Sequence, residues 1–94
     1  MPPSHRHTDI CTGHGCYPSR ANAEGSPDTF VNNLAQHRLG DAWESHCCGP
    51  PCHGANADGG SPDVFTNGLP SCRIGDPVSC GSNMSEGSED VIIN

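Results

Sequence analysis

Three of the four arginines in this chain occupy the same position in a repeated motif. Each of the three is followed three residues later by an aspartate and is preceded directly by a histidine or a cysteine. The three copies run from Arg6 to Asp9, from Arg38 to Asp41 and from Arg73 to Asp76. Because a sequence that repeats along the chain folds into units that repeat in space, this motif constrains the architecture more than any bulk property does.

A second repeated segment precedes two of these motifs and recurs at the end of the sequence. Residues 25–34 and 60–69 both begin Gly-Ser-Pro-Asp and match at most of their positions. Residues 87–94 are a third copy that stops at Asn94, so the sequence ends with half of a unit. The matching half stands at the N-terminus. The pattern predicts three similar structural units.

Each complete unit is predicted to form a β-hairpin. The Asn-Gly pair at 67–68 is a strong two-residue turn signal, because both central positions of such a turn need a positive φ. The Asn-Asn pair at 32–33 is a weaker form of the same signal. In the unit with the stronger signal, residues 63–66 form the outgoing strand and residues 69–73 form the returning strand.

The third hairpin has no returning strand close to it in sequence. Residues 90–93 form its first strand, and residues 3–6 are the expected partner. This pairing closes a ring of three hairpins and covers strand edges that would otherwise favour aggregation. Helices are not expected, because the two candidate segments, 32–37 and 42–45, are too short to be stable. The predicted fold is all-β with pseudo-threefold symmetry.

The composition leaves little material for a hydrophobic core. Only 32% of the residues are apolar, whereas seven cysteines and six histidines are present. In a chain of this length, that balance predicts stabilisation by a metal ion or by disulfides. No apolar run resembles a signal peptide. The sequence therefore predicts synthesis in a reducing cytoplasm, where clustered Cys and His favour metal binding over disulfides.

The charge of the chain disfavours two classes of partner. The net charge is -7 and there is no lysine, which weighs against binding to nucleic-acid phosphates and to anionic membrane surfaces. No apolar stretch approaches the roughly 20 residues of a membrane-spanning helix. Neither a nucleic-acid partner nor a membrane span is expected.

A histidine or a cysteine also follows each aspartate of the repeated motif. His14 and His46 lie five residues after their aspartates, and Cys80 lies four residues after its own. A pseudo-threefold fold brings such equivalent loops together around one axis. Two imidazoles and one thiolate would supply three of the four ligands of a tetrahedral zinc ion.

An insertion in the middle unit, residues 47–54, offers the fourth ligand. His53 is the predicted residue, and Cys52 is a substitute for it. Four protein ligands leave no open coordination position, so a site of three histidines and one cysteine is structural. Such a site would add folding free energy that the core lacks. The alternative interpretation is that these residues are scattered over unrelated loops.

A rival set of residues is equally symmetric. His5, His37 and Cys72 each directly precede the arginine of a motif, and on strands they would share one face. Three interpretations of this set are open: a second metal site, the primary metal site, or side chains that simply fill the core. The sequence does not assign a role to the other five cysteines, which are Cys11, Cys16, Cys47, Cys48 and Cys52. A disulfide between Cys11 and Cys16 is one candidate, and the reduced state is the alternative.

The repeated Arg and Asp are predicted to build the scaffold. The aspartate would accept hydrogen bonds from the turn, and the arginine would bridge neighbouring units. Threefold repetition suits a scaffold and not a single active site, and no nucleophile with a matched base stands out. No catalytic residues are predicted.

The motifs together resemble those of the PAAR-repeat proteins. Residues 70–76, Pro-Ser-Cys-Arg-Ile-Gly-Asp, are similar to the family's Pro-Ala-Ala-Arg-x-Gly-Asp. Residues 60–70 resemble its Gly-Ser-x-x-Val-x-x-Asn-Gly-x-Pro hairpin, and residues 76–81 resemble its loop ending in Cys-Gly. The resemblance extends from about residue 3 to residue 94.

The chain also departs from the family pattern. Residues 35–38 lack the proline and one alanine, and residues 7–9 lack the glycine before the aspartate. His5, His37 and Cys72 stand where the family has alanine. The insertion in the middle unit, with its additional cysteines, is unusual.

The resemblance implies a fold and a zinc site. The whole chain, residues 1–94, would form a single small cone-shaped domain. A zinc ion near the point of the cone would be held by three histidines and one cysteine. That ligand set matches His14, His46, His53 and Cys80.

The resemblance also implies a function. Such proteins cap the trimeric β-helical spike of type VI secretion machines and contractile phage tails, and they sharpen it for piercing a target-cell envelope. One chain would sit on each trimer, its blunt base extending the spike's sheets by β-augmentation. The protein, made in the cytoplasm, would leave in a virion or through type VI secretion and touch the target membrane transiently. No fused toxin domain is expected.

Other interpretations of the residues remain open at this point. One is a zinc-binding interaction module with an unrelated partner. Another is a zinc hydrolase, in which water replaces one presumed ligand. A disulfide-stapled secreted peptide is a weaker possibility, because the number of cysteines is odd. The residues do not distinguish a phage from a secretion system, nor do they identify the spike.

Overall fold

The computed structural model describes residues 2–94 and is built from three antiparallel hairpins. The first pairs β1 (Phe30–Val31) with β2 (Leu34–Ala35), the second β3 (Ala42–Cys47) with β4 (Cys52–Asn56), and the third β5 (Phe65–Thr66) with β6 (Leu69–Pro70). The described residues contain no helix, which confirms the all-β prediction. No helix in this part of the chain is long and apolar enough to span a membrane.

The two short hairpins turn where the sequence predicts. Asn32 and Asn33 have φ of 52° and 67°, and Asn67 and Gly68 have φ of 53° and 78°. Both central positions of each turn are therefore left-handed, as a two-residue hairpin requires. The strands are shorter than the predicted segments 63–66 and 69–73, because the chain soon leaves its partner strand to pair with another unit.

The N-terminal and C-terminal segments pair with each other, as predicted. Pro3 forms an antiparallel bridge with Ile92. The Ser4 amide donates to the Val91 carbonyl at 2.9 Å, and the amide of Ile93 donates to the carbonyl of Pro2 at 2.9 Å. The third unit is thus completed by residues from both ends of the chain.

A closed ring of backbone hydrogen bonds joins the three units. His5 donates to the carbonyl of Cys72 at 3.0 Å, Cys72 donates to His37 at 3.0 Å, and His37 donates to His5 at 3.2 Å. Each unit therefore bonds to the next in the same way, and the third returns to the first. This circle confirms the predicted pseudo-threefold arrangement.

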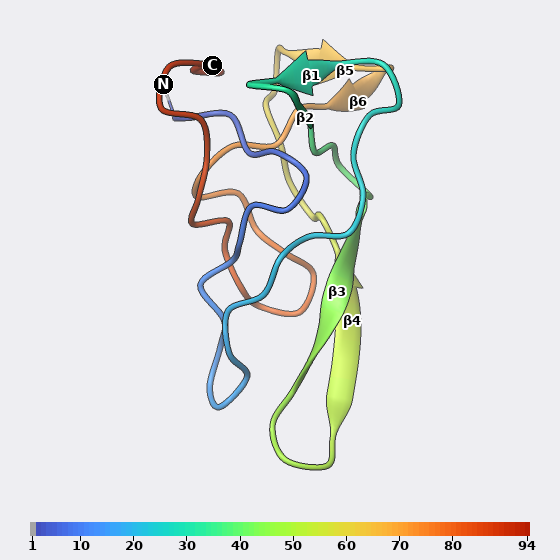
Figure 1. Cartoon of the computed structure of the whole chain (residues 1–94), viewed down its shortest axis with the longest axis vertical. Coiled ribbons are helices and arrows are strands. Elements are labelled where there is room, and N and C mark those ends of the chain that lie inside the picture. Colours follow the sequence, from blue (N-terminus) through green and yellow to red (C-terminus); the bar gives the residue numbers. More distant parts are fainter. Residues whose placement is uncertain (1) are drawn as a thin grey trace.

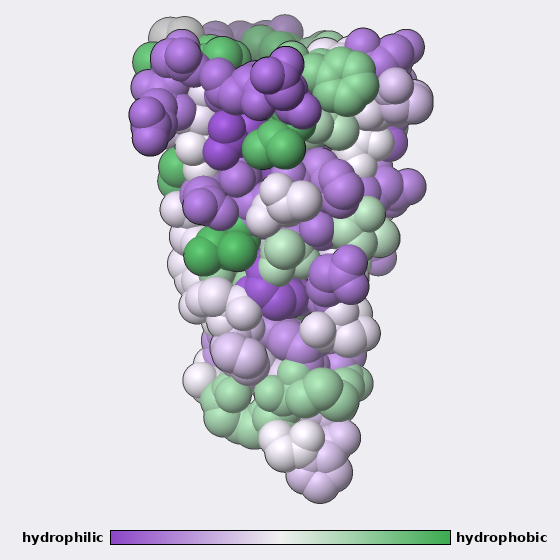
Figure 2. All heavy atoms as spheres, in the orientation of Figure 1, coloured by the Kyte–Doolittle hydropathy of each residue, from purple (hydrophilic) through white to green (hydrophobic). Residues whose placement is uncertain are grey.

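The molecule narrows from one end to the other. Its principal dimensions are 37 × 23 × 23 Å. The short hairpins β1–β2 and β5–β6 lie at the wide end with the C-terminus, whereas β3–β4 runs to the opposite end (Figure 1). The space-filling view shows the resulting taper (Figure 2). We call the wide end the base and the narrow end the tip.

The repeated arginines and aspartates have the predicted scaffold role. In each motif the aspartate accepts a hydrogen bond from the arginine's backbone amide and pairs with its guanidinium. Arg6 also donates to Asn32 and Arg38 donates to Asn67, both at 3.1 Å. Because these asparagines lie in the hairpin turns, two of the arginines bridge neighbouring units.

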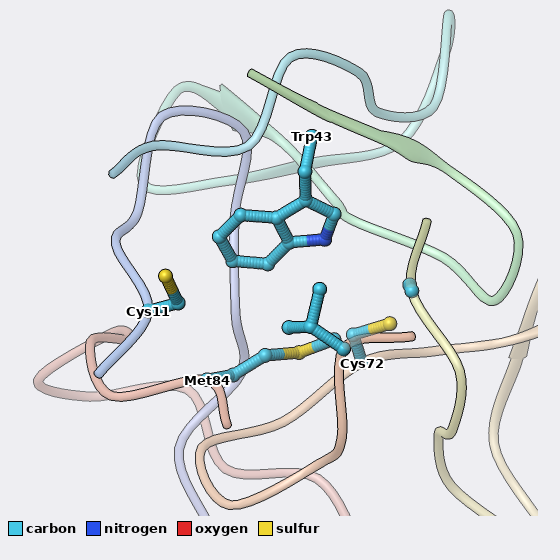
Figure 3. Close-up of a cluster of buried hydrophobic side chains, with 6 residues drawn as sticks. Cys11, Trp43, Cys72 and Met84 are labelled. Carbon is cyan, nitrogen blue, oxygen red and sulfur yellow. The ribbon is translucent and has the colours of Figure 1, made fainter. Parts of the chain in front are cut away.

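The hydrophobic core is small and lies between the base and the tip. Trp43 of β3, Met84, Cys11 and Cys72 lie in one cluster of buried side chains (Figure 3). Ala57 and Val78 complete the cluster. A core of this size gives limited hydrophobic stabilisation, which agrees with the expectation from the composition.

The longest hairpin was missed by the sequence analysis, which treated residues 47–54 only as an insertion. In the structure this segment extends β3 and β4 beyond the core. Trp43 pairs with Ala55 and His46 pairs with His53, so β3 holds one extra residue between these two pairs. This β-bulge turns His46 inward, to the same side as Trp43, although the two residues are three positions apart.

Candidate metal centre

The structure brings the four predicted ligand residues together near the tip. The ligand atoms of His14, His46, His53 and Cys80 all lie within 4.8 Å of one another. The Nε2 atom of His53 is 2.7 Å from that of His46 and 3.1 Å from that of His14. We call these four residues the His/Cys cluster.

Three separate segments supply the cluster. His46 and His53 are cross-strand partners in β3 and β4. His14 begins a tight turn in which its amide and that of Tyr17 donate to each other's carbonyls, at 3.0 and 2.8 Å. Cys80 lies in a turn closed by the bond from the Val78 amide to the Ser82 carbonyl. The cluster therefore forms only when these segments meet.

Neighbouring groups orient the imidazoles. The Nδ1 of His46 lies 2.8 Å from the carbonyl oxygen of Pro18 and must donate to it, because a carbonyl only accepts. In the neutral ring, Nε2 then presents its lone pair to the cluster. Tyr17 stacks on His14 at a centroid distance of 4.9 Å and lies 4.3 Å from the ring of His53. The rings are thus held by hydrogen bonding and by stacking.

The electrostatics favour metal-binding forms of two ligands. Partial removal from water lowers the pKa of His53, and the nearby His46 and His14 lower it further. Burial raises the pKa of the Cys80 thiol, but hydrogen bonds from the Ser82 backbone and from a nearby arginine outweigh it, so the pKa lies below its usual value. A neutral imidazole and a thiolate are the forms that bind metals.

The donor set fits a metal ion. Three imidazole nitrogens and one sulfur are the ligand types of tetrahedral zinc sites, in which two nitrogens lie about 3.3 Å apart. The nitrogen separations of 2.7 and 3.1 Å are close to that spacing. The four residues are therefore placed so that they could hold a metal ion.

The rival set of residues is used differently. His5 and His37 donate from Nδ1 to the carbonyls of Glu86 and Glu24, both at 2.7 Å, and the Cys72 sulfur lies 3.4 Å from the carbonyl of Gly59. Each accepting carbonyl belongs to the residue before the first glycine of a Gly-Ser repeat. All three side chains are fully buried, and in residues 2–94 they form no metal-binding group. They fill the core and tie neighbouring units together.

The cysteine expectations require correction. Cys16 is disulfide-bonded to Cys48, and Cys47 is bonded to Cys52. The candidate pair of Cys11 with Cys16 is wrong. The preference for metal over disulfides fails for the four cysteines that form disulfides, whereas Cys80 joins the cluster that could hold a metal ion. Cys52 cannot substitute for His53, since its sulfur is already bonded. Which cysteine pairs with which cannot be deduced from the spacing of cysteines in the sequence.

Sequence reasoning missed two residues beside the cluster. Tyr17 stacks on His14 and lies at a tilt against the rings of His46 and His53, and no repeat marks that residue. Arg20 places Nη2 at 3.4 Å from the Cys80 sulfur. A signal for Arg20 did exist, because it is the one arginine that stands outside the Arg-x-x-Asp repeat.

Comparison with known proteins gives one result. A family model described as the PAAR motif matches residues 22–85, more than half of the chain. The matched region contains His46, His53 and Cys80, whereas His14 precedes it. No curated protein matches the sequence.

Proposed function

Because this chain belongs to the PAAR family, whose members act as structural spike tips, we propose that it caps a trimeric β-helical spike and sharpens it for piercing a target-cell envelope. The observation that carries this proposal is the closed ring of bonds among His5, His37 and Cys72. One chain arranged in this way presents three similar faces, which is what a threefold partner requires.

The base carries three exposed apolar side chains at equivalent positions. Phe30, Phe65 and Ile92 each lie four residues after the serine of the Gly-Ser repeat, and their exposed fractions are 60%, 56% and 55%. Phe30 and Phe65 belong to β1 and β5 at the wide end (Figure 1). Exposed apolar groups of this kind favour a protein interface, and their threefold placement supports a trimeric partner.

We propose that the ion held by the His/Cys cluster is zinc. A zinc ion would supply a tetrahedral cross-link with no open coordination position. Residues of the chain would orient the three imidazole ligands: the Pro18 carbonyl orients His46, and Tyr17 packs against His14 and His53. Such a cross-link stiffens the tip without a larger core and offers no position for a hydrolytic water.

The proposed setting is a contractile phage tail or a type VI secretion machine. The chain would be made in the cytoplasm, leave it with the particle and meet the target membrane transiently. The disulfides Cys16–Cys48 and Cys47–Cys52 support this setting, because disulfides persist outside the reducing cytoplasm.

The base proposal is tested by mixing the chain with a trimeric β-helical spike and measuring the mass of the complex by light scattering. We expect one chain per trimer. Replacing Phe30 and Phe65 by serine should weaken the complex roughly tenfold or more, because buried aromatic anchors dominate interfaces. Ile10→Ser is the matched control, since Ile10 is exposed but lies outside the three equivalent positions. Failure to bind any such spike would refute the proposal.

The zinc proposal is tested by elemental analysis of the purified protein and by the absorption spectrum after cobalt substitution. We expect one zinc per chain and the intense visible bands of tetrahedral cobalt. A spectrum typical of five or six ligands would contradict the closed site and would favour a hydrolytic centre.

A further inference from the structure

Arg20 differs from every other arginine of the chain. In residues 2–94 the other three arginines each pair with the aspartate of their own motif, whereas Arg20 has no carboxylate within ion-pair distance. Yet its side chain is buried, with 8% of the residue exposed. Burial of a charged group without a partner is strongly unfavourable, so the groups around Arg20 must compensate its charge.

Those groups are two sulfurs, a carbonyl and an aromatic ring. Nη1 of Arg20 donates to the Cys11 sulfur at 3.1 Å, Nη2 donates to the Cys80 sulfur at 3.4 Å, and Nε donates to the Glu44 carbonyl at 2.8 Å. The guanidinium carbon lies 5.2 Å from the centre of the Trp43 ring, within the range of a cation–π interaction. Each of the three guanidinium nitrogens of Arg20 therefore donates a hydrogen bond.

The three hydrogen-bonded groups come from the three segments that build the His/Cys cluster. Cys11 lies three residues before His14, and Glu44 lies two residues before His46 on β3. Cys80 is itself a member of the cluster. A single planar guanidinium therefore contacts one group from each of the three pseudo-symmetric units, and one of these groups, the Cys80 sulfur, belongs to the cluster.

We propose that Arg20 is the positioning residue of the His/Cys cluster: its forked N–H groups hold the Cys80 sulfur and the strand carrying His46 at the spacing that a metal ion needs. This inference rests on the proposed function of the cluster as a metal site. A metal-bound sulfur keeps part of its negative charge, so it also gives the buried guanidinium an anionic partner. The planar fork of arginine suits this task, whereas lysine offers only a point charge.

The test compares Arg20→Met and Arg20→Lys with the parent chain. Zinc affinity is measured by competition with a chromogenic chelator, and we expect Arg20→Met to bind about 10- to 100-fold more weakly, as is typical when an outer-shell partner is removed. In the cobalt-substituted protein, the sulfur-to-cobalt charge-transfer band should shift while the tetrahedral bands remain. Arg20→Lys should recover only part of the affinity, because it restores the charge without the fork.

The matched control is Arg38→Met, which removes the same group from a motif outside the cluster. Arg38 pairs with Asp41, so its loss should lower stability but leave zinc affinity and the cobalt spectrum unchanged. If Arg20→Met has the affinity and spectrum of the parent chain, the inference about Arg20 is wrong while the metal proposal stands. If the parent chain binds no metal, both are wrong.

A second measurement covers the case in which Arg20→Met does not fold. In the parent chain, the guanidinium nitrogen resonances of Arg20 should shift when zinc is added to the metal-free protein, because Nη2 faces a ligand sulfur. Those of Arg38 should not move. Equal, negligible shifts for both arginines would overturn the inference.

Discussion

The first Arg-x-x-Asp motif has a threonine, Thr8, at the position where the other two motifs have glycine. Thr8 has a φ of 81°, and the equivalent residues are Gly40 with 89° and Gly75 with 94°. This left-handed conformation is strained for a β-branched side chain. The Thr8 side chain is exposed, so the strain is not offset by packing.

We therefore expect Thr8→Gly to raise the free energy of unfolding by about 1 kcal/mol, as measured by urea denaturation. The reciprocal change, Gly75→Thr, should lower it by a similar amount. A Cβ at Gly75 meets no atom within 4 Å, so only the backbone conformation is tested. A less stable Thr8→Gly variant would contradict this explanation.

At the same scale, His37 makes stability depend on pH. Burial lowers its pKa to about 4 from 6.5. The unfolded chain therefore takes up a proton below pH 6.5, whereas the folded chain does so only near pH 4. Stability is lost as the pH falls across this window, by about 3 kcal/mol for this one group.

The measurement is the free energy of unfolding between pH 7 and pH 4 for the parent chain and for His37→Gln. The variant should show a shallower loss, although not a flat one, because burial also lowers the pKa of His5. Identical pH profiles for the two proteins would show that His37 does not titrate in this way.

At the scale of elements, the hairpin β3–β4 depends on covalent links. It extends beyond the core. Cys48 in its turn is disulfide-bonded to Cys16, and Cys47 at the end of β3 is disulfide-bonded to Cys52 at the start of β4. One link ties the hairpin to the turn that carries His14, and the other closes the hairpin on itself. Together they hold His46 and His53 in place even before a metal ion binds.

The two disulfides should contribute unequally. Their sequence separations are 32 and 5 residues, and a longer closed loop restricts the unfolded chain more. Replacing Cys16 and Cys48 by serine should lower the free energy of unfolding by about 4 kcal/mol, and replacing Cys47 and Cys52 should lower it by about 2 kcal/mol. Denaturant titration checks both. A larger loss for the shorter loop would contradict the loop-length argument.

At the scale of the whole molecule, the two ends are stabilised by different means. Backbone pairing around the pseudo-threefold ring, together with the ion pairs of Arg6, Arg38 and Arg73, holds the base. Disulfides and the His/Cys cluster hold the tip. Removing a metal ion bound by the His/Cys cluster should therefore loosen the tip and leave the base folded.

We expect chelation to raise amide hydrogen exchange at residues 11–14 and to leave the ring amides of His5, His37 and Cys72 protected. A reducing agent added with the chelator should increase exchange at the tip further, because the second set of links is then lost. The reductant alone is the control. Equal loss of protection at both ends would mean that tip and base unfold together.

Much of the fold follows from local backbone preferences that repeat along the chain. The asparagine and glycine turns at 32–33 and 67–68 predicted the hairpins, and the Arg-x-x-Asp repeat predicted the ring. The four cluster residues were also predicted, because His14, His46 and Cys80 each follow the aspartate of their own motif at similar spacing and His53 lies in the insertion beside them. In each case the information lies within a few residues of the position it concerns, so the amino-acid order is enough.

Other features depend on which distant segments meet. The bulge that turns His46 inward arises from pairing between β3 and β4, and the partner of Cys16 is 32 residues away. Arg20 touches three units that only the closed ring brings together. These contacts depend on distances between segments remote in sequence, which no periodicity encodes, and so the tertiary structure alone decides them.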